Sequence, residues 1–168
     1  MKQCKVLITG PFNSGKTQFI KSISDIKPIT TERIISSESK KVKKTTTVAM
    51  DYGRVNVDNI YFHLFGTPGQ ERFDFMWSIL SLNIDTCLFL IDSVSHNFDE
   101  AENIISYFNK QSNNIPKLIV ATKQDLPQAQ LLSQINKHFL RYNLPIMACN
   151  AKNKKSVHRV LLELKKFL

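Results

Sequence analysis

The fold is decided by residues 4–17, whose sequence is CKVLITGPFNSGKT. Residues 4–9 form a short, nearly continuous apolar run, which is typical of a strand buried on both faces of a parallel sheet. Residues 10–17 match the pattern G-x-x-x-x-G-K-[ST] and lie between this strand and a predicted helix, the context that a phosphate-binding loop requires. The stretch therefore predicts a phosphate-binding loop at the first strand-to-helix turn of an α/β protein.

The residue types of this loop suit a nucleoside triphosphate. Its glycines let backbone N–H groups point inward around a phosphate, and the N-terminus of the following helix adds partial positive charge. Lys16 would bring a positive charge to the β- and γ-phosphates, and the Thr17 hydroxyl would bind Mg²⁺. A glycine-rich turn without a ligand is the alternative interpretation. The residues expected to bind the nucleotide here are Asn13, Ser14, Gly15, Lys16, Thr17 and Gln18.

Strand and helix patterns alternate along the rest of the chain. Further buried strands are predicted at residues 87–91, 118–121 and 146–149. Helices are predicted by three apolar groups at helical spacing: Ile104, Ile105 and Phe108; Leu131, Leu132, Ile135 and Phe139; Val157, Val160, Leu161 and Leu164.

An antiparallel hairpin is predicted before these elements. Val48, Met50 and Tyr52 alternate with polar neighbours, and Asp58-Asn59 offers a turn before the apolar run Ile60–Phe65. We therefore predict a doubly wound, six-stranded and mostly parallel sheet with one antiparallel edge strand and helices on both faces, as in P-loop NTPases. Residues 25–44 have no clean period, and an irregular segment of this length is usually functional or disordered.

Composition is that of an ordinary soluble protein. The 168 residues, 42% hydrophobic and 22% charged, suit a single domain covering residues 1–168. We find no apolar run of about 18 residues, no secretory segment and no lipidation signal, so we expect a cytoplasmic protein without a transmembrane segment or lipid anchor. The three cysteines, Cys4, Cys87 and Cys149, lack metal-ligand spacing and are expected to be reduced and buried.

The net charge of +9 leaves two interpretations open. Basic patches at residues 40–44 and 152–166 would attract nucleic acid, anionic lipid or an acidic partner. Alternatively, they form a solvated surface. No RNA- or DNA-binding motif accompanies the charge, so we do not expect nucleic acid as a partner.

Residues 122–125 indicate which base is bound. Thr122-Lys123-Gln124-Asp125 follows the predicted strand at 118–121. A carboxylate can accept hydrogen bonds from both N1–H and the exocyclic amine of guanine, a pair of donors that adenine lacks. Asp125 therefore favours guanine, and the stem of Lys123 would lie across the base. Taken alone these four residues fit a strand-end turn, but after a phosphate-binding loop they indicate a guanine nucleotide.

These motifs together resemble those of the Ras-like small GTPases over the whole chain. Beyond the two motifs above, GTPGQ stands at residues 66–70 and Asn-Ala-Lys at 150–152, where the family has Ser-Ala-Lys. TTTVAMDYG at 45–53 and LFGTPGQERFDFM at 64–76 are similar to a prokaryotic group of small GTPases related to MglA and to the GTPases of actinobacterial conservons. The resemblance implies the small G-protein fold and a GTP/GDP switch with slow intrinsic GTP hydrolysis and Mg²⁺ as cofactor. It also implies a protein regulator or effector at the switch regions, such as a roadblock-domain protein.

The resemblance assigns roles to single residues. Thr47 matches the switch I threonine that reaches Mg²⁺ and the γ-phosphate, with Thr46 as the next candidate. Gly69 would donate its N–H to the γ-phosphate, and Gln70 would orient the attacking water, unless it is simply a surface residue at a helix start. The expected catalytic residues are Gln70, Lys16 and Thr47, and the expected metal ligands are Thr17 and Thr47. The residues expected at the base are Thr122, Lys123, Asp125, Asn150, Ala151 and Lys152, with the Ala151 N–H directed to guanine O6.

Two departures from the family bear on catalysis. Gly66 replaces the aspartate that holds Mg²⁺ through water, and Asp51 on the neighbouring predicted strand either compensates or is an exposed strand residue. Phe12 stands where many members carry glycine and would crowd an arginine finger supplied by a partner, which leaves Lys43 and Lys44 as candidate charges in cis. A nucleotide-locked scaffold without useful catalysis is therefore the alternative function. The aromatic and apolar group of Phe73, Phe75, Met76 and Trp77 is expected to pack mostly in the core, with part of it available to an effector.

Overall fold

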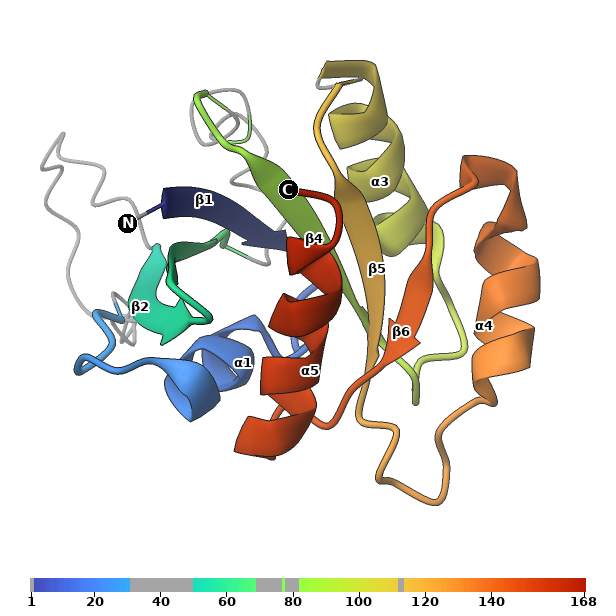
Figure 1. Ribbon diagram of the computed structural model, residues 1–168. Helices are drawn as coiled ribbons and strands as arrows, with labels where there is room; N and C mark the ends of the chain where they lie inside the picture. Colours follow the sequence, from blue (N-terminus) through green and yellow to red (C-terminus); the bar gives the residue numbers. More distant parts are fainter. Residues whose placement is uncertain (1, 31–49, 69–76, 78–81, 112–113) are drawn as a thin grey trace, which may run out of the picture.

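The computed structural model describes residues 2–30, 50–68, 77, 82–111 and 114–168. Its elements are β1 (Lys2–Thr9), α1 (Lys16–Ile23), β2 (Asp51–Val57), β3 (Ile60–Gly66), β4 (Thr86–Asp92), α3 (Asp99–Gln111), β5 (Lys117–Thr122), α4 (Leu132–Phe139), the 3-10 turn η2 (Leu140–Tyr142), β6 (Ile146–Ala148) and α5 (Lys154–Lys165). The strands form one six-stranded sheet in the order β2-β3-β1-β4-β5-β6, and every pairing is parallel except that of β2 with β3 (Figure 1). The predicted doubly wound sheet with one antiparallel edge strand is confirmed.

Helices cover both faces of the sheet, so each face has its own apolar core. The alternation along β1 shows the division: Val6 and Ile8 pack with α1 and α5, whereas Leu7 packs with α3 and α4. Figure 1 shows α1 beside α5 on one face, with α3 and α4 on the other. Because the central strands are buried on both faces, their sequences are nearly continuous apolar runs, as the sequence predicts.

Two details of the predicted elements are wrong. The run at 146–149 was expected to be a buried strand, but β6 is an edge strand, its three residues are half-buried, and Cys149 follows it. Leu131 was expected on the apolar face of the helix ending at Phe139, yet it precedes α4 as the N-cap and is 66% exposed. Its backbone N–H donates to Gln134 Oε1 at 2.9 Å, which marks the start of the helix.

The beginning of the segment predicted as irregular, residues 25–44, lies along the outer edge of β2. Asp25 N–H donates to the Arg54 carbonyl at 2.7 Å, and Ile29 and Tyr52 exchange backbone hydrogen bonds of 3.0 and 2.9 Å. These contacts occupy part of the backbone that an edge strand would otherwise expose. Residues 31–44 lie outside the described residues.

Trp77 packs against α3, with its ring centroid 5.3 Å from that of Tyr107 and 5.9 Å from that of Phe108. This contact confirms the core-packing interpretation for Trp77, while Phe73, Phe75 and Met76 fall outside the described residues. Among the helices that the structure describes, none is long and apolar enough to cross a membrane.

All three cysteines are buried and unpaired, as predicted. Burial raises the pKa of the Cys4 thiol to about 12 and that of Cys149 to about 11. Burial also raises the pKa of Cys87. The thiolate is the reactive form of cysteine, so these thiols are protected in the native protein.

We expect a thiol reagent such as DTNB to modify none of the three cysteines in native protein at pH 8 and all three in denaturant. A Lys155→Cys variant, which adds a thiol on an exposed part of α5, should react with one equivalent and serves as the control. Because the folded pKa values lie above the unfolded ones, the thiols ionise first in the unfolded chain. Their contribution to the free energy of unfolding is therefore present below about pH 8.5 and lost as pH rises toward the folded pKa values. Prompt modification of a native thiol would contradict this assignment.

Candidate functional site

The loop from Gly10 to Thr17 connects β1 to α1 at the carboxyl edge of the sheet, where a ligand site is expected in folds of this type. A Cβ on Gly10 would lie 2.1 Å from the Leu90 carbonyl oxygen of β4, so the backbone of the loop lies directly against the sheet. Asn13 (φ 63°) and Gly15 (φ 93°) adopt the left-handed conformation that turns the chain back toward α1. Gly15 is also the N-cap of α1, and no side chain caps the first turn. The first N–H groups of α1 therefore suit an anionic ligand.

Lys16 places its charge over the same loop. Its side chain is 8% exposed, and Nζ donates to the carbonyl oxygens of Gly10 and Pro11, both at 2.7 Å. The ammonium group is thus held at the concave side of the loop, where a phosphate would meet both the lysine and the helix N-terminus. Gln18 points elsewhere: it is exposed, and Nε2 donates to Ser22 Oγ at 2.9 Å.

Thr122 joins the phosphate-binding loop to the predicted base-binding motif. It ends β5, is fully buried, and its hydroxyl oxygen lies 2.9 Å from the Ser14 carbonyl oxygen and 3.0 Å from the Ile91 carbonyl oxygen. One hydroxyl therefore connects the loop, β4 and β5. The interaction fixes the distance between the two motifs, which lie about a hundred positions apart in the sequence.

Lys123 and Asp125 follow at the same edge. Lys123 has φ 60°, and its Nζ lies 2.5 Å from Asp92 Oδ2 at the end of β4. This ion pair holds the lysine stem beside the strand ends. The Asp125 side chain is exposed, which leaves its carboxylate available for a ligand.

The turn at 150–152 lies close to the phosphate-binding loop. A Cβ on Gly15 would be 3.7 Å from Ala151 Cβ, and the Ser22 hydroxyl of α1 donates to the Ala151 carbonyl at 2.5 Å. Asn150 Oδ1 accepts from the Lys152 N–H at 2.9 Å, which closes the turn. The Lys152 side chain is exposed.

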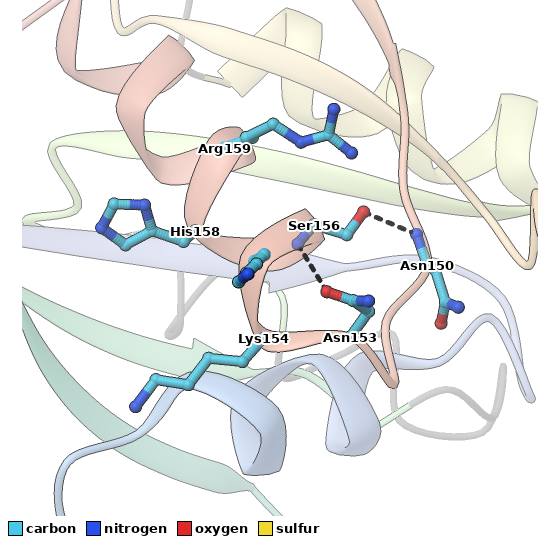
Figure 2. A pocket seen from close by; sticks show the side chains of 7 residues that line it. Asn150, Asn153, Lys154, Ser156, His158 and Arg159 are labelled. Carbon is cyan, nitrogen blue, oxygen red and sulfur yellow. Dashed lines mark hydrogen bonds between the residues drawn. The ribbon is translucent and has the colours of Figure 1, made fainter.

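Ser156 supports this turn from the first turn of α5 (Figure 2). Its hydroxyl accepts from the Asn150 N–H at 3.0 Å, while its own N–H donates to Asn153 Oδ1, the N-cap of α5, at 3.1 Å. An open cavity of about 820 Å³ lies beside the turn and is lined by Asn150, Asn153, Lys154, Lys155, Ser156, His158 and Arg159. These residues all come from the turn and α5, so the cavity is separate from the phosphate-binding loop.

The start of the GTPGQ motif is also fixed to the loop region. Thr67 N–H donates to the Ile8 carbonyl at 2.9 Å, and its buried hydroxyl donates to Thr9 Oγ1 at 3.0 Å. Six residues with predicted roles lie outside the described residues, and those roles stay predictions: Lys43, Lys44, Thr46, Thr47, Gly69 and Gln70. Phe12, within the phosphate-binding loop, is 68% exposed.

Asp51 is not an exposed strand residue. It is 8% exposed, and its Oδ2 accepts a hydrogen bond from the Thr17 hydroxyl, the predicted Mg²⁺ ligand. Oxygen atoms of hydroxyl and carboxylate groups are the ligands that Mg²⁺ prefers, so this pair fits that ion. Within the described ranges, no group of three His, Cys, Asp or Glu side chains could hold a metal.

Sequence reasoning missed three residues that hold the site together. Asp92 pairs with Lys123, Ser22 binds the Ala151 carbonyl, and Ser156 binds the Asn150 N–H. Asp92 and Lys123 each follow an apolar run that is predicted to be a parallel strand. Because the carboxyl ends of parallel strands meet at one edge of the sheet, their positions in the sequence could have indicated the pair. For Ser22 and Ser156 the sequence contains no comparable signal.

Comparison with known proteins agrees with this geometry. The sequence profile of the Ras family matches residues 5–168. This chain belongs to the Ras family. Membership implies binding of a guanine nucleotide and suggests a capacity for GTP hydrolysis.

Several relatives are similar over most of their length. An uncharacterized protein of Methanocaldococcus jannaschii, MJ1339, is 31% identical over 74% of this chain and 72% of its own length. The mutual gliding-motility protein MglA of Myxococcus xanthus is 26% identical over 84% of this chain and 78% of its own. ADP-ribosylation factor-like protein 3 of Caenorhabditis elegans is 31% identical over 89% of this chain and 79% of its own length. The small GTPase Arl6 of Trypanosoma brucei, solved with the nucleotide analogue GppNp, has the same fold, with a TM-score of 0.76, 21% identity and coverage of 98% of this chain and 96% of that one.

We expect Thr122→Val to weaken GTP binding and to lower the free energy of unfolding by about 1–3 kcal/mol, because the buried Ser14 and Ile91 carbonyl groups lose the single hydroxyl proton that they share. The matched control is Thr86→Val, since Thr86 is equally buried and donates to the Pro116 carbonyl at 2.8 Å. This control should lower stability within the same range and leave GTP binding unchanged. Urea denaturation and titration with GTP measure the two effects. Equal losses of affinity in both variants would show that Thr122 acts through general stability.

Proposed function

We propose that this chain is a GTP/GDP switch that hydrolyses GTP slowly without a partner. The proposal rests on the contact of the Thr122 hydroxyl with the Ser14 carbonyl, because it joins a phosphate-binding loop to a guanine-selective motif at one sheet edge. A nucleotide along this edge would meet the loop with its phosphates and residues 122–125 with its base. We further propose that residues 1–168 form a single GTP-binding domain.

The phosphates would be bound by the loop and the start of α1. The backbone N–H groups of Asn13 to Thr17 supply donors, and the N-terminus of α1 supplies partial positive charge. Lys16 would exchange its contacts with the Gly10 and Pro11 carbonyls for the β- and γ-phosphates, a short movement because the ammonium group already lies over the loop.

The base would be bound between Lys123 and the 150–152 turn. Asp125 would accept hydrogen bonds from guanine N1–H and the exocyclic amine, and the Ala151 N–H would donate to O6. The Lys123 stem, held by Asp92, would cover one face of the base. Asn150 closes the turn that presents the Ala151 N–H, so it would act by positioning.

Mg²⁺ would be bound by the Thr17 hydroxyl together with phosphate oxygens and Thr47. The ion would neutralise charge on the β- and γ-phosphates. Gly69 would bind the γ-phosphate, and Gln70 would orient the water that attacks it in line. The segment before Thr47 would then be ordered by the γ-phosphate and released after hydrolysis, which is the physical basis of a switch.

The proposed partner is a protein that senses the switch segments. Residues 45–53 and 64–76 are similar to prokaryotic small GTPases related to MglA and to those of actinobacterial conservons, and the 26% identity to MglA supports this grouping. The resemblance to this group implies a roadblock-domain protein as regulator or effector, so this is the partner that we propose first.

A nucleotide-locked scaffold is the second candidate, and the exposure of Phe12 favours it. The ring is 68% exposed at the phosphate-binding loop, where it would obstruct an arginine supplied by a partner. Such an arginine accelerates hydrolysis by roughly 10³–10⁵-fold, so its exclusion would leave GTP bound for long periods. Finding GTP rather than GDP in protein purified from cells would support the scaffold.

We expect Asp125→Ala to reduce GTP affinity on the order of 100-fold, because two hydrogen bonds to a charged group are lost. ATP lacks the two donors, so its weaker binding should not change, and the preference for GTP over ATP should collapse. Competition of GTP and ATP against a fluorescent GDP analogue measures both affinities, with ATP as the internal control. A wild-type protein that binds ATP as tightly as GTP would overturn the proposed function.

We expect Gln70→Ala to slow single-turnover hydrolysis of GTP on the order of 100-fold, since misplacing a reactant by about 1 Å has an effect of that size. GTP affinity should stay unchanged, which separates a catalytic loss from a binding loss. Phosphate release with Mg²⁺ present, measured for wild type and variant side by side, tests this. Unchanged release in the variant would exclude the role of Gln70, and absence of release from the wild type would favour the scaffold.

A further inference from the structure

We propose that Asp51 supplies the carboxylate of the Mg²⁺ site and thereby replaces the aspartate that the Ras-like GTPases carry at the position of Gly66. The inference rests on the proposed GTP-binding function and names a residue of the same site. Asp51 would then be a positioning residue for the metal. It lies on β2, whereas the aspartate that it would replace lies at the end of β3.

The direct observation is the contact between Asp51 and Thr17. Asp51 is the first residue of β2 and is almost fully buried, and its Oδ2 accepts a hydrogen bond from the Thr17 hydroxyl. No Lys, Arg or His of the described part of the chain forms an ion pair with it. A buried carboxylate is costly unless a charge compensates it, and a divalent cation beside Thr17 would do so.

The register of the hairpin explains how the carboxylate can come from a different strand. Asp51 lies directly opposite Gly66 in the antiparallel pair of β2 and β3. A Cβ at position 66 would lie 3.1 Å from Asp51 Cβ and 3.6 Å from Asp51 Oδ2. The Asp51 side chain therefore fills the space that a side chain at position 66 would enter, and glycine at 66 leaves room for it.

Close packing of α1 on this hairpin brings Thr17 to Asp51. Ile20, one turn after Thr17, is fully buried against two glycines of the hairpin. A Cβ on Gly53 would lie 2.6 Å from Ile20 Cγ2, and one on Gly66 would lie 3.0 Å from Ile20 Cδ1. Because neither strand presents a Cβ at these two positions, the helix can approach closely enough for the hydroxyl to reach the carboxylate.

The test compares the Mg²⁺ dependence of nucleotide release in three proteins: wild type, Asp51→Asn and Asp58→Asn. Asparagine keeps an acceptor for the Thr17 hydroxyl but removes the charge. Asp58 lies in the turn of the same hairpin, is exposed, and pairs with Lys165 at 3.1 Å, so Asp58→Asn removes the same charge away from the site. Release of a fluorescent GDP analogue is followed while free Mg²⁺ is varied.

We expect Asp51→Asn to require roughly 10–100-fold more Mg²⁺ to slow GDP release by half, the range measured for residues that support a metal from outside its direct ligands. Asp58→Asn should match the wild type. GDP release in excess EDTA should be equal in all three proteins, because only the metal-dependent part of binding is changed. A purely structural role for Asp51 would instead alter release in EDTA.

A double variant, Asp51→Gly with Gly66→Asp, moves the carboxylate to the neighbouring strand. Glycine at 51 removes the Cβ that lies 3.1 Å from a side chain at 66, and the flexible end of the Ile20 side chain, 3.0 Å away, must also shift. The double variant should therefore regain part of the Mg²⁺ affinity that Asp51→Asn loses. Equal Mg²⁺ dependence of Asp51→Asn and wild type would overturn the inference while leaving the GTP-binding function intact. A wild-type protein that does not bind GDP at any Mg²⁺ concentration would overturn both.

Discussion

The close approach of the phosphate-binding loop to β4 is the constraint on which the site depends. Gly10 lies against the Leu90 carbonyl with no room for a side chain, and the Thr122 hydroxyl then holds the same loop through the Ser14 carbonyl. The loop is therefore part of the packed sheet, because two central strands fix it. Three later segments, at Thr67, residues 122–125 and residues 150–152, are therefore held in fixed positions near the loop. A parallel sheet forms a ligand site at its carboxyl edge in this way.

The sheet was predictable because a strand that is buried on both faces has a nearly continuous run of apolar residues. β1, β4 and β5 are continuous apolar runs, and the Asp58-Asn59 turn marks the hairpin. The errors occur where burial is partial. β6 is an edge strand, and Leu131 precedes its helix, so an apolar residue type at either place did not imply a buried position. Likewise, hydrogen bonds from residues 25–30 to β2 are made by backbone atoms, which carry no signature in residue type.

The candidate site was predictable where chemistry depends on residue type at fixed spacing. The loop at 10–17, the motif at 122–125 and the turn at 150–152 lie close together, while the binding roles of their residues stay predictions. Supporting residues such as Ser22 and Ser156 were not predictable, because serine is common and its partner is chosen by tertiary packing. The sequence left Asp51 either as a compensating carboxylate or as an exposed strand residue. Its burial opposite Gly66 excludes only the second alternative, and this burial follows from strand register, which the hydrophobic pattern does not specify for single residues.

The pairing of Asp51 with Gly66 would also make the proposed metal site sensitive to the register of β2 against β3. A slip of β2 along β3 by one residue would turn Asp51 to the opposite face of the sheet, and a slip by two would carry it about 7 Å along the strand. Either movement would separate the carboxylate from Thr17 while leaving the phosphate-binding loop undisturbed. Metal affinity at the proposed site would consequently depend on the position of the hairpin, so a partner that moves the hairpin would change how tightly the ion is held.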